Sequence, residues 1–224
     1  MKKKIKQSQT GEFIKSGFNV IVSHRLPSHI SLDLVFADVK SKVPSHLLVG
    51  LDYVYVGEFS FLKERELNAM YKDGALFISN DQDDQDDMVD DIIHEIAHLV
   101  EDNYNQFLYQ DQTILKEFLS KRESLYHLLE SEKDMFDSYF PNYGLFTNPD
   151  YSQAFDMFLY KQVGYENLTL LTVNIFYSPY AATSLREYFA NGFEAFFHHK
   201  DIARLKNISP FLFKKISNLE SIKA

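Results

Sequence analysis

The chain of 224 residues contains no cysteine and no long apolar run. The missing cysteines exclude disulfide bonds, zinc sites built from thiolates and catalysis by a cysteine nucleophile. No uninterrupted apolar stretch approaches the ~20 residues that a helix needs to cross a bilayer, so we expect no membrane partner. Long segments rich in proline, glycine and serine are also missing, which argues against separate domains joined by a linker.

Basic residues are in the minority. Lysine and arginine together number 23, against 32 aspartates and glutamates, and the net charge is −9. Because nucleic-acid binding needs a basic face, we expect no nucleic-acid partner. The opening "MKKKIKQSQTGEF" is basic but has no apolar segment behind it, so it lacks the pattern of a signal peptide. As written, we expect a cytoplasmic protein, with a secreted or delivered effector as the alternative and residues 1–16 as a candidate flexible end.

The residue pattern in the first part of the chain predicts strands. Residues 17–60 are rich in branched and aromatic side chains, and "FNVIVSH" and "LDLVFADV" are clear strand candidates. Asp73-Gly74 is a strong turn signal, and "ALFISN" after it predicts one more strand. We expect residues 75–80 to form an edge strand that binds an extended peptide by main-chain pairing, with a plain internal strand as the alternative.

From about Asp87 the hydrophobic period becomes helical. We expect further helices at 111–131, 152–163, 184–200 and around 209–222, with a loop at 141–150 and irregular structure at 165–182. Strands followed by helices predict an α+β fold, with a small N-terminal mixed sheet and then a mostly helical half that carries the metal helix. Hydrophobic residues make up 45% of the chain, enough for a packed core, and we expect a single domain over residues 1–224.

The stretch "DDIIHEIAHLVED", residues 90–102, contains the pattern H-E-x-x-H, with His94, Glu95 and His98. Two histidines at i and i+4 lie one helical turn apart on one face, so both imidazoles can reach one metal ion. Glu95 lies about 100° round the helix from His94. There it can act as a general base on a water molecule that the metal activates. Zinc is the expected cofactor, and a chance motif on an amphipathic helix is the alternative.

A catalytic zinc site needs a third protein ligand and one open position. The extended form H-x-x-G-x-x-H is missing, so the remaining candidates are Glu117, Glu123, Glu187, Glu194, His198 and His199. Glu187 is favoured because it opens a polar stripe on an otherwise aromatic helix, in "SLREYFANGFEAFF". Asn191, one turn later, is a candidate to orient a ligand histidine. The alternative role for Glu187 is a capping box with Ser184, in which its side chain folds back on the helix start.

The segments "HEIAH" and "YAATSLREYFANGFEAFF" together resemble the catalytic domain of anthrax lethal factor and the related Pro-Pro endopeptidases. In that family an H-E-x-x-H helix is followed by a helix that opens E-Y-F-A, whose glutamate is the third zinc ligand. A tyrosine seven residues before that glutamate stabilises the transition state. The resemblance therefore implies His94, His98 and Glu187 as zinc ligands, Glu95 as the general base and Tyr180 as the oxyanion-binding residue.

The resemblance covers the H-E-x-x-H helix and about 20 residues around Glu187. His98 and Glu187 are 89 positions apart, a longer gap than in those relatives. We expect the extra length, at about 104–165, to be a helical insertion that forms part of the cleft wall. The resemblance implies a zinc-dependent endopeptidase of the gluzincin type that acts on a protein or peptide. The alternative is a non-catalytic, zinc-stabilised binding or regulatory module with a zincin-like fold.

Overall fold

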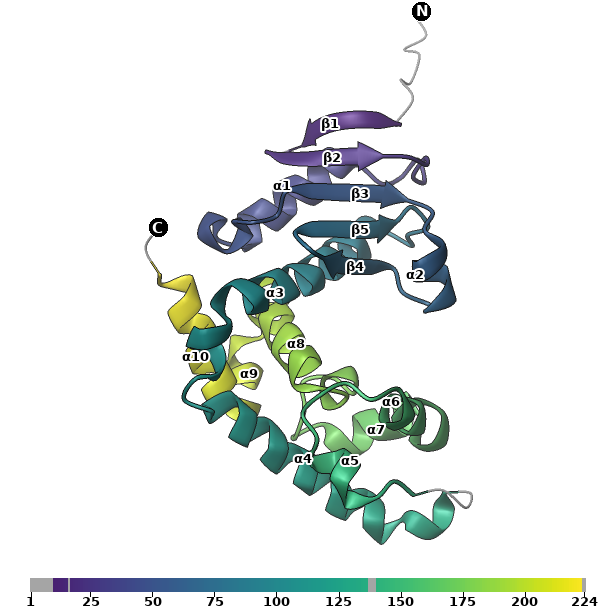
Figure 1. The fold of residues 1–224 in the computed structure, drawn as a ribbon, viewed down its shortest axis with the longest axis vertical. Helices are drawn as coiled ribbons and strands as arrows, with labels where there is room; N and C mark the ends of the chain where they lie inside the picture. Colours follow the sequence, from purple (N-terminus) through teal and green to yellow (C-terminus); the bar gives the residue numbers. More distant parts are fainter. Residues whose placement is uncertain (1–9, 16, 137–139, 223–224) are drawn as a thin grey trace, which may run out of the picture. The chain divides into compact units, whose positions relative to one another are not determined.

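Figure 1 shows the computed structural model of the chain, in which residues 10–15, 17–136 and 140–222 are described. The chain forms two compact units, Met1–Leu99 and Val100–Ala224. Of the expected flexible end, residues 1–9 and 16 lie outside the described residues, and Gly11–Lys15 form a strand. The expectation of one domain over residues 1–224 stays a prediction.

The first unit is built on a five-stranded mixed sheet in the order β1-β2-β3-β5-β4 (Figure 1). The strands are β1 (Gly11–Lys15), β2 (Phe18–Val22), β3 (Tyr53–Gly57), β4 (Ala69–Lys72) and β5 (Ala75–Ser79). Strands β2, β3 and β5 are parallel, whereas β1 and β4 run antiparallel to their neighbours. The small N-terminal mixed sheet expected from the sequence is therefore confirmed.

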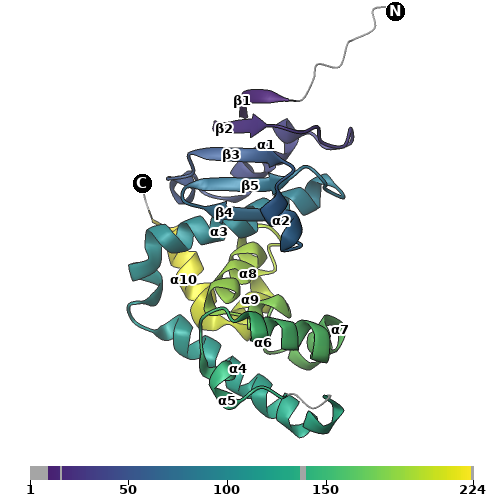
Figure 2. The ribbon, with the colours of Figure 1, turned by 45° about the vertical axis from the view of Figure 1, so that its right-hand side comes forward.

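One face of this sheet forms the core of the first unit. Alternate residues of the three parallel strands are buried, as expected for strands with one covered face; they are Val20, Val22, Val54, Val56, Leu76 and Ile78. Helix α1 (Leu32–Lys42) packs against this face, with the Phe36 ring centroid 5.4 Å from that of Phe18 on β2. Figures 1 and 2 both show α1 behind the sheet.

The expectation of a strand at "LDLVFADV" is wrong, because this segment forms helix α1. Its apolar residues Leu32, Val35, Phe36 and Val39 recur at helical spacing, and all four are buried. Burial of this stripe against the sheet outweighs the strand propensity of the branched side chains. Two short helices, η1 (Ser45–Leu48) and α2 (Ser60–Glu64), lie on either side of β3 in the sequence.

Strands β4 and β5 form a hairpin that closes at Asp73-Gly74, as expected. Both turn residues have positive φ, 49° for Asp73 and 80° for Gly74, which is the backbone that a type I′ turn requires. Strand β5 pairs with β3 on one side and β4 on the other, so the expectation that residues 75–80 form an edge strand is wrong. The first arm of the hairpin, β4, takes the edge instead.

Helix α3 (Gln85–Tyr109) begins in the first unit and continues into the second, because the boundary at Leu99 falls inside it. Asp84 caps its start, since one carboxylate oxygen accepts hydrogen bonds from the main-chain N–H groups of Asp86 (2.7 Å) and Asp87 (3.0 Å). Its apolar face is buried as the helical period predicts, at Met88, Val89, Ile92, Ile93, Ile96, Leu99 and Val100.

The second unit is helical, which confirms the mostly helical half. After the end of α3 come α4 (Thr113–Ser131), η2 (Lys133–Met135), α5 (Tyr143–Thr147), α6 (Gln153–Met157), α7 (Tyr165–Thr172), α8 (Leu185–Phe197), α9 (Ile202–Ile208) and α10 (Pro210–Glu220). A π-helical segment, Phe158–Val163, continues α6, and the short 3-10 turn η4 (Tyr180–Ala182) precedes α8. Helix α8 forms the centre of this unit, with every residue from 188 to 197 buried.

Three segments of the second unit differ from the expectation. The loop expected at 141–150 contains α5, the irregular segment at 165–182 contains α7, and α9 precedes the expected last helix. These helices have five, eight and seven residues, too few for hydrophobic periodicity to identify them. The helix expected at 152–163 does end at Gly164, which has a φ of 79°, but its second half is π-helical.

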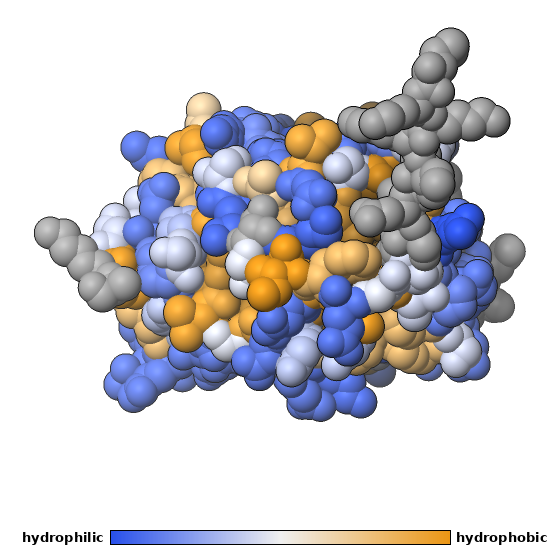
Figure 3. All heavy atoms as spheres, turned by 90° about the horizontal axis from the view of Figure 1, so that it is seen from above, coloured by the Kyte–Doolittle hydropathy of each residue, from blue (hydrophilic) through white to orange (hydrophobic). Residues whose placement is uncertain are grey.

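Among the described residues, no helix is both long and apolar enough to cross a membrane. Figure 3 shows one face of the molecule, on which hydrophobic side chains occur in separate groups among hydrophilic ones. Exposed apolar side chains of the first unit include Ile14, Leu34 and Val49. Scattered exposure of this kind is usual for a folded protein surface.

Candidate metal centre

His94 and His98 lie on one face of α3, one helical turn apart. Their ring centroids are 5.0 Å apart and the rings are nearly perpendicular. His98 is buried, with 6% of its surface exposed, and His94 is half-buried. Helix α3 is buried on its apolar face, so the backbone that carries the two imidazoles is held firmly. Two nitrogen donors at this spacing are suited to bind one metal ion.

Glu95 contacts the edge of the sheet within the first unit. Its Oε2 atom accepts a hydrogen bond of 2.5 Å from the main-chain N–H of Tyr71 on β4. In an edge strand, alternate residues direct their N–H and C=O groups away from the sheet, so this bond lies on the open side of β4. It fixes the carboxylate through one oxygen, Oε2.

Asp91 lies one turn before His94 on α3. Burial raises the pKa of its carboxyl group to about 7, an effect that a hydrogen bond with Gln82 and the neighbouring His94 oppose. Gln82 itself is buried, with 5% of its surface exposed, and its amide nitrogen donates to the Ser79 carbonyl. The first turns of α3 thus contain a desolvated acid beside the face that carries His94 and His98, a feature that the sequence pattern did not single out.

Glu187 lies in the first turn of α8, in the second unit. The Ser184 hydroxyl caps this helix by accepting a hydrogen bond of 3.2 Å from the Glu187 main-chain N–H. This is the serine half of the capping box that the sequence offered as the alternative role. The bond uses the main chain of Glu187, so it leaves the half-buried carboxylate able to bind a metal.

Tyr180 opens the η4 turn, four residues before the cap of α8. Burial raises the pKa of its phenol far above the ordinary value, and the nearby carboxylates of Glu187 and Asp156 add to the shift. The phenol is therefore protonated at neutral pH and can donate a hydrogen bond. The electrostatic effect of Glu187 on Tyr180 means that the second unit brings these two predicted site residues together.

Asn191 connects α8 to the segment that precedes the η4 turn. Its side-chain nitrogen donates to the Glu187 carbonyl at 3.0 Å, and its side-chain oxygen accepts a hydrogen bond from the Ser178 hydroxyl. Asn191 is 5% exposed. Both ends of its amide thus have partners inside the second unit, and its expected role in orienting a ligand histidine stays a prediction. Ser178 was missed because a lone serine before a proline carries no pattern.

Arg186 links the first turn of α8 to the end of α3. Its Nε atom is 3.5 Å from the Glu101 carboxylate, and its Nη1 atom is 3.6 Å from that of Asp102. Glu101 is buried and also accepts a hydrogen bond of 2.5 Å from the Tyr109 hydroxyl. These residues all belong to the second unit. No local sequence pattern indicates this contact, because it joins positions more than eighty residues apart.

Other candidates for the third ligand have different partners. The Glu117 carboxylate accepts hydrogen bonds from the Tyr188 hydroxyl and from the main-chain N–H groups of Phe211 and Leu212, so it caps α10. The Glu123 carboxylate accepts one from the exposed Tyr143. The three others lie near the end of α8: Glu194 and His198 are buried, and the His199 ring stacks on Tyr177. Glu117 and Glu123 are therefore poor metal ligands.

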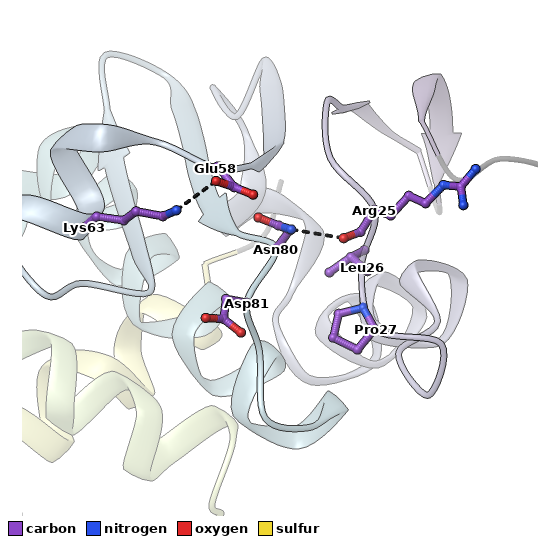
Figure 4. A pocket seen from close by; sticks show the side chains of 7 residues that line it. All are labelled: Arg25, Leu26, Pro27, Glu58, Lys63, Asn80 and Asp81. Carbon is purple, nitrogen blue, oxygen red and sulfur yellow. Dashed lines mark hydrogen bonds and ion pairs between the residues drawn. The ribbon is translucent and has the colours of Figure 1, made fainter.

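A separate cavity of about 410 Å³ lies in the first unit, where the three parallel strands end (Figure 4). Its walls include Arg25 after β2, Glu58 after β3 and Asn80 after β5. Glu58 pairs with Lys63 at 2.8 Å, and the Asn80 amide nitrogen donates to the Arg25 carbonyl. Figure 4 shows the Arg25 side chain directed away from the other lining residues. The predicted site residues do not line this cavity.

The donor set fits zinc. Two imidazoles at helical spacing and a carboxylate are the ligands of many catalytic zinc sites, and a chain without cysteine can offer no thiolate. His94, Glu95 and His98 belong to the first unit, whereas Tyr180 and Glu187 belong to the second. Comparison of the chain with family models, with curated proteins and with solved structures gives no match. The function therefore has to be argued from these residues themselves.

Proposed function

We propose that this chain is a zinc-dependent endopeptidase that hydrolyses a protein or peptide substrate. His94, His98 and Glu187 are the proposed metal ligands, Glu95 the general base and Tyr180 the oxyanion-binding residue. The observation that carries the proposal is the arrangement on α3. Two histidines share one helical face, and the glutamate between them is held at the open edge of β4.

The choice of Glu187 as third ligand rests on its neighbour in the sequence. Arg186 pairs with Glu101 on α3. Glu101 follows His98 by one turn of the same helix. An ion pair so close to the metal-binding face favours the carboxylate of the next residue, Glu187, over the other candidates. The resemblance of this segment to lethal factor and the Pro-Pro endopeptidases supports the same choice.

In the proposed reaction, a bound zinc ion would supply Lewis acidity, which lowers the pKa of a water molecule and polarises the scissile carbonyl. Glu95 accepts the proton of the attacking water on Oε1, while the Tyr71 N–H holds Oε2. It then passes this proton to the leaving amine. The Tyr180 phenol, protonated because burial raises its pKa, donates a hydrogen bond to the oxyanion that develops.

An extended substrate would pair with β4. This strand is at the edge of the sheet, and its outward N–H and C=O groups suit main-chain pairing with a peptide. Tyr71 on this strand holds the proposed base, so a peptide bound here would lie beside Glu95. This assignment replaces residues 75–80 as the expected substrate strand.

The insertion at about 104–165 is proposed as one wall of the cleft. It contributes Asp156, whose carboxylate accepts a hydrogen bond of 2.9 Å from the Tyr151 hydroxyl. The negative charge of Asp156 also raises the pKa of the Tyr180 phenol. The inserted segment is thus close enough to the proposed oxyanion-binding residue to influence its chemistry.

A peptide library tests this proposal. Zinc-loaded wild-type protein is incubated with a library of unstructured peptides that covers all residue pairs, and new peptide ends are identified by mass spectrometry. His98→Ala, which removes a proposed ligand, should produce none. His127→Ala is the matched control, because His127 is an exposed histidine on α4, and it should cleave like the wild type. Zinc-loaded wild-type protein that produces no new ends would contradict the proposal and favour the binding module.

A further inference from the structure

A fully buried arginine in the second unit takes no part in the proposed chemistry. Arg122 of α4 has 1% of its surface exposed. Its Nη1 atom donates to the carbonyls of Ala182 at 2.8 Å and Thr183 at 3.3 Å, and its Nη2 atom donates to the Leu145 carbonyl. One side chain thereby joins α4, α5 and the η4 turn. Figures 1 and 2 both show α4 and α5 side by side.

Among the described residues, Arg122 has carbonyl groups and ring faces as partners and no carboxylate. Its guanidinium lies 3.9 Å from the centroid of the Phe155 ring, with Phe118 and Phe146 farther away at 5.4 and 6.0 Å. Burial lowers the pKa of Arg122 to about 9, which still leaves it charged at neutral pH. A buried charge beside carbonyl groups and ring faces costs free energy, because it has lost its hydration. Packing alone would be served better by an apolar side chain, so the arginine calls for another explanation.

Arg122 binds the carbonyls of Ala182 and Thr183, the residues at the end of the turn that carries Tyr180. Within this turn, the Thr183 hydroxyl donates to the Tyr180 carbonyl at 2.8 Å, and the Thr183 N–H donates to the same oxygen at 3.0 Å. Arg122 therefore binds the two residues that close the turn behind Tyr180. On the other side, the Ser178 hydroxyl connects the turn to Asn191. The turn is held at both ends.

We propose that Arg122 is a positioning residue for Tyr180. Its guanidinium anchors the end of the η4 turn, and this anchoring fixes the Tyr180 hydroxyl where it meets the oxyanion. The benefit for catalysis rests on the proposed peptidase function, whereas the anchoring of Tyr180 does not. A single ammonium group cannot span all three carbonyls, so lysine at this position should anchor the turn only in part.

A double-mutant cycle separates positioning from general stability. Arg122→Met should lower kcat about 10²-fold with KM nearly unchanged, because a small displacement of a catalytic group is enough for such a loss. Arg122→Lys, which keeps the charge and most of the volume, should lose about 10-fold. In a Tyr180→Phe background, Arg122→Met should cause no further loss of kcat. If the losses of kcat from Arg122→Met and Tyr180→Phe multiply in the double variant, the proposal is overturned.

Lys121 provides the matched control. It is the neighbouring cation on α4, and its Nζ atom donates to the Ile175 and Ile208 carbonyls, away from the η4 turn. Lys121→Met therefore also removes a cation that binds two carbonyls, and it should lower the unfolding temperature without a selective loss of kcat. A loss of kcat in Lys121→Met equal to that in Arg122→Met would contradict a specific role for Arg122.

A readout independent of turnover keeps the inference testable if the peptidase proposal fails. Fluorotyrosine introduced at position 180 reports the surroundings of the phenol by ¹⁹F NMR. The resonance should shift or broaden in Arg122→Met and in Arg122→Lys, and it should stay in place in Lys121→Met. An unchanged resonance in folded Arg122→Lys would overturn the anchoring. An absence of peptide cleavage with a shifted resonance would contradict the peptidase proposal and support the anchoring.

Discussion

The two helices that carry the proposed site are built in opposite ways. On α3, His94, Glu95 and His98 lie within five consecutive residues, and the helix itself sets their spacing. On α8 only Glu187 belongs to the proposed site, and its companion Tyr180 lies on a separate turn. That turn is held by contacts from Arg122 and Asn191. The chemistry of α3 is therefore local, whereas that of the α8 region depends on residues distant in the sequence.

This difference separates two kinds of substitution. A change on the polar face of α3 should remove a reacting group and leave the rest of the protein in place. A change around α8 should act through geometry, because the turn before the helix is supported from several sides. The loss of kcat should be larger for substitutions on α3, with little effect on the fold. It should be smaller around α8 and should depend on the neighbouring residues.

The largest loss is expected at Glu95. Glu95→Gln keeps the size of the side chain and removes the proton acceptor, so kcat should fall by about 10³-fold while zinc stays bound. Peptide cleavage and metal content are measured on the same preparation. Asp87→Asn, which neutralises an exposed carboxylate of the same helix, is the control and should retain activity. Turnover by Glu95→Gln close to that of the wild type would show that another group is the base.

A smaller loss is expected at Tyr180. Tyr180→Phe removes one hydrogen-bond donor to the oxyanion, so kcat should fall by about 10²-fold with little change in KM. Steady-state kinetics on one cleaved peptide provide both constants. Tyr126→Phe on α4 is the control, because it removes a hydroxyl that donates to Glu130. A rise in KM with kcat unchanged would instead assign Tyr180 to substrate binding.

The site residues on α3 were easier to predict from the sequence than those around α8, because the former form a local motif and the latter depend on distant residues. His94, Glu95 and His98 form a local motif, and the helix around them has a long apolar period. Glu187 was favoured among six candidates by the polar stripe on its helix, and Tyr180 could be proposed only through a family resemblance. The contacts of Arg122 and Arg186 were missed, because they join distant parts of the sequence. Arg122 binds the η4 turn sixty residues later, and Arg186 pairs with Glu101, more than eighty residues earlier.

For the fold too, local features could be predicted from the sequence, and features that depend on distant segments could not. The α+β order and the hairpin at Asp73-Gly74 follow from local signals. The edge position of β4 does not, because strand order depends on pairings between distant segments. Helix α1 was mistaken for a strand, since its branched residues suit both structures and only burial on the sheet decides between them.

Stability offers a comparison inside the second unit. Glu117→Ala removes the acceptor of three hydrogen bonds, from the Tyr188 hydroxyl and from two N–H groups at the start of α10. The free energy of unfolding should fall by about 2 kcal/mol. Glu123→Ala, at an exposed acceptor of one bond, should change it by less than about 0.5 kcal/mol. Equal effects in urea unfolding would show that the cap of α10 contributes nothing.

Stability should also depend on pH through Lys121. Burial lowers the pKa of this ammonium group to about 8, below its value of about 10.4 in an unfolded chain. Between these two values the unfolded state binds more protons, so this group makes stability rise as the pH rises from 8 to 10.4. Lys121→Met should lose that rise in urea unfolding. A rise of equal size in the variant would assign it to other groups.

Zinc affinity shows whether residues of α3 and α8 bind one zinc ion together, as proposed. Competition with a chelating dye measures zinc binding by the wild type, by Glu187→Ala and by Glu123→Ala. We expect one zinc ion per wild-type chain, affinity weakened by at least ~10²-fold in Glu187→Ala, and wild-type affinity in Glu123→Ala. Wild-type affinity in Glu187→Ala would contradict the claim that α8 completes the site.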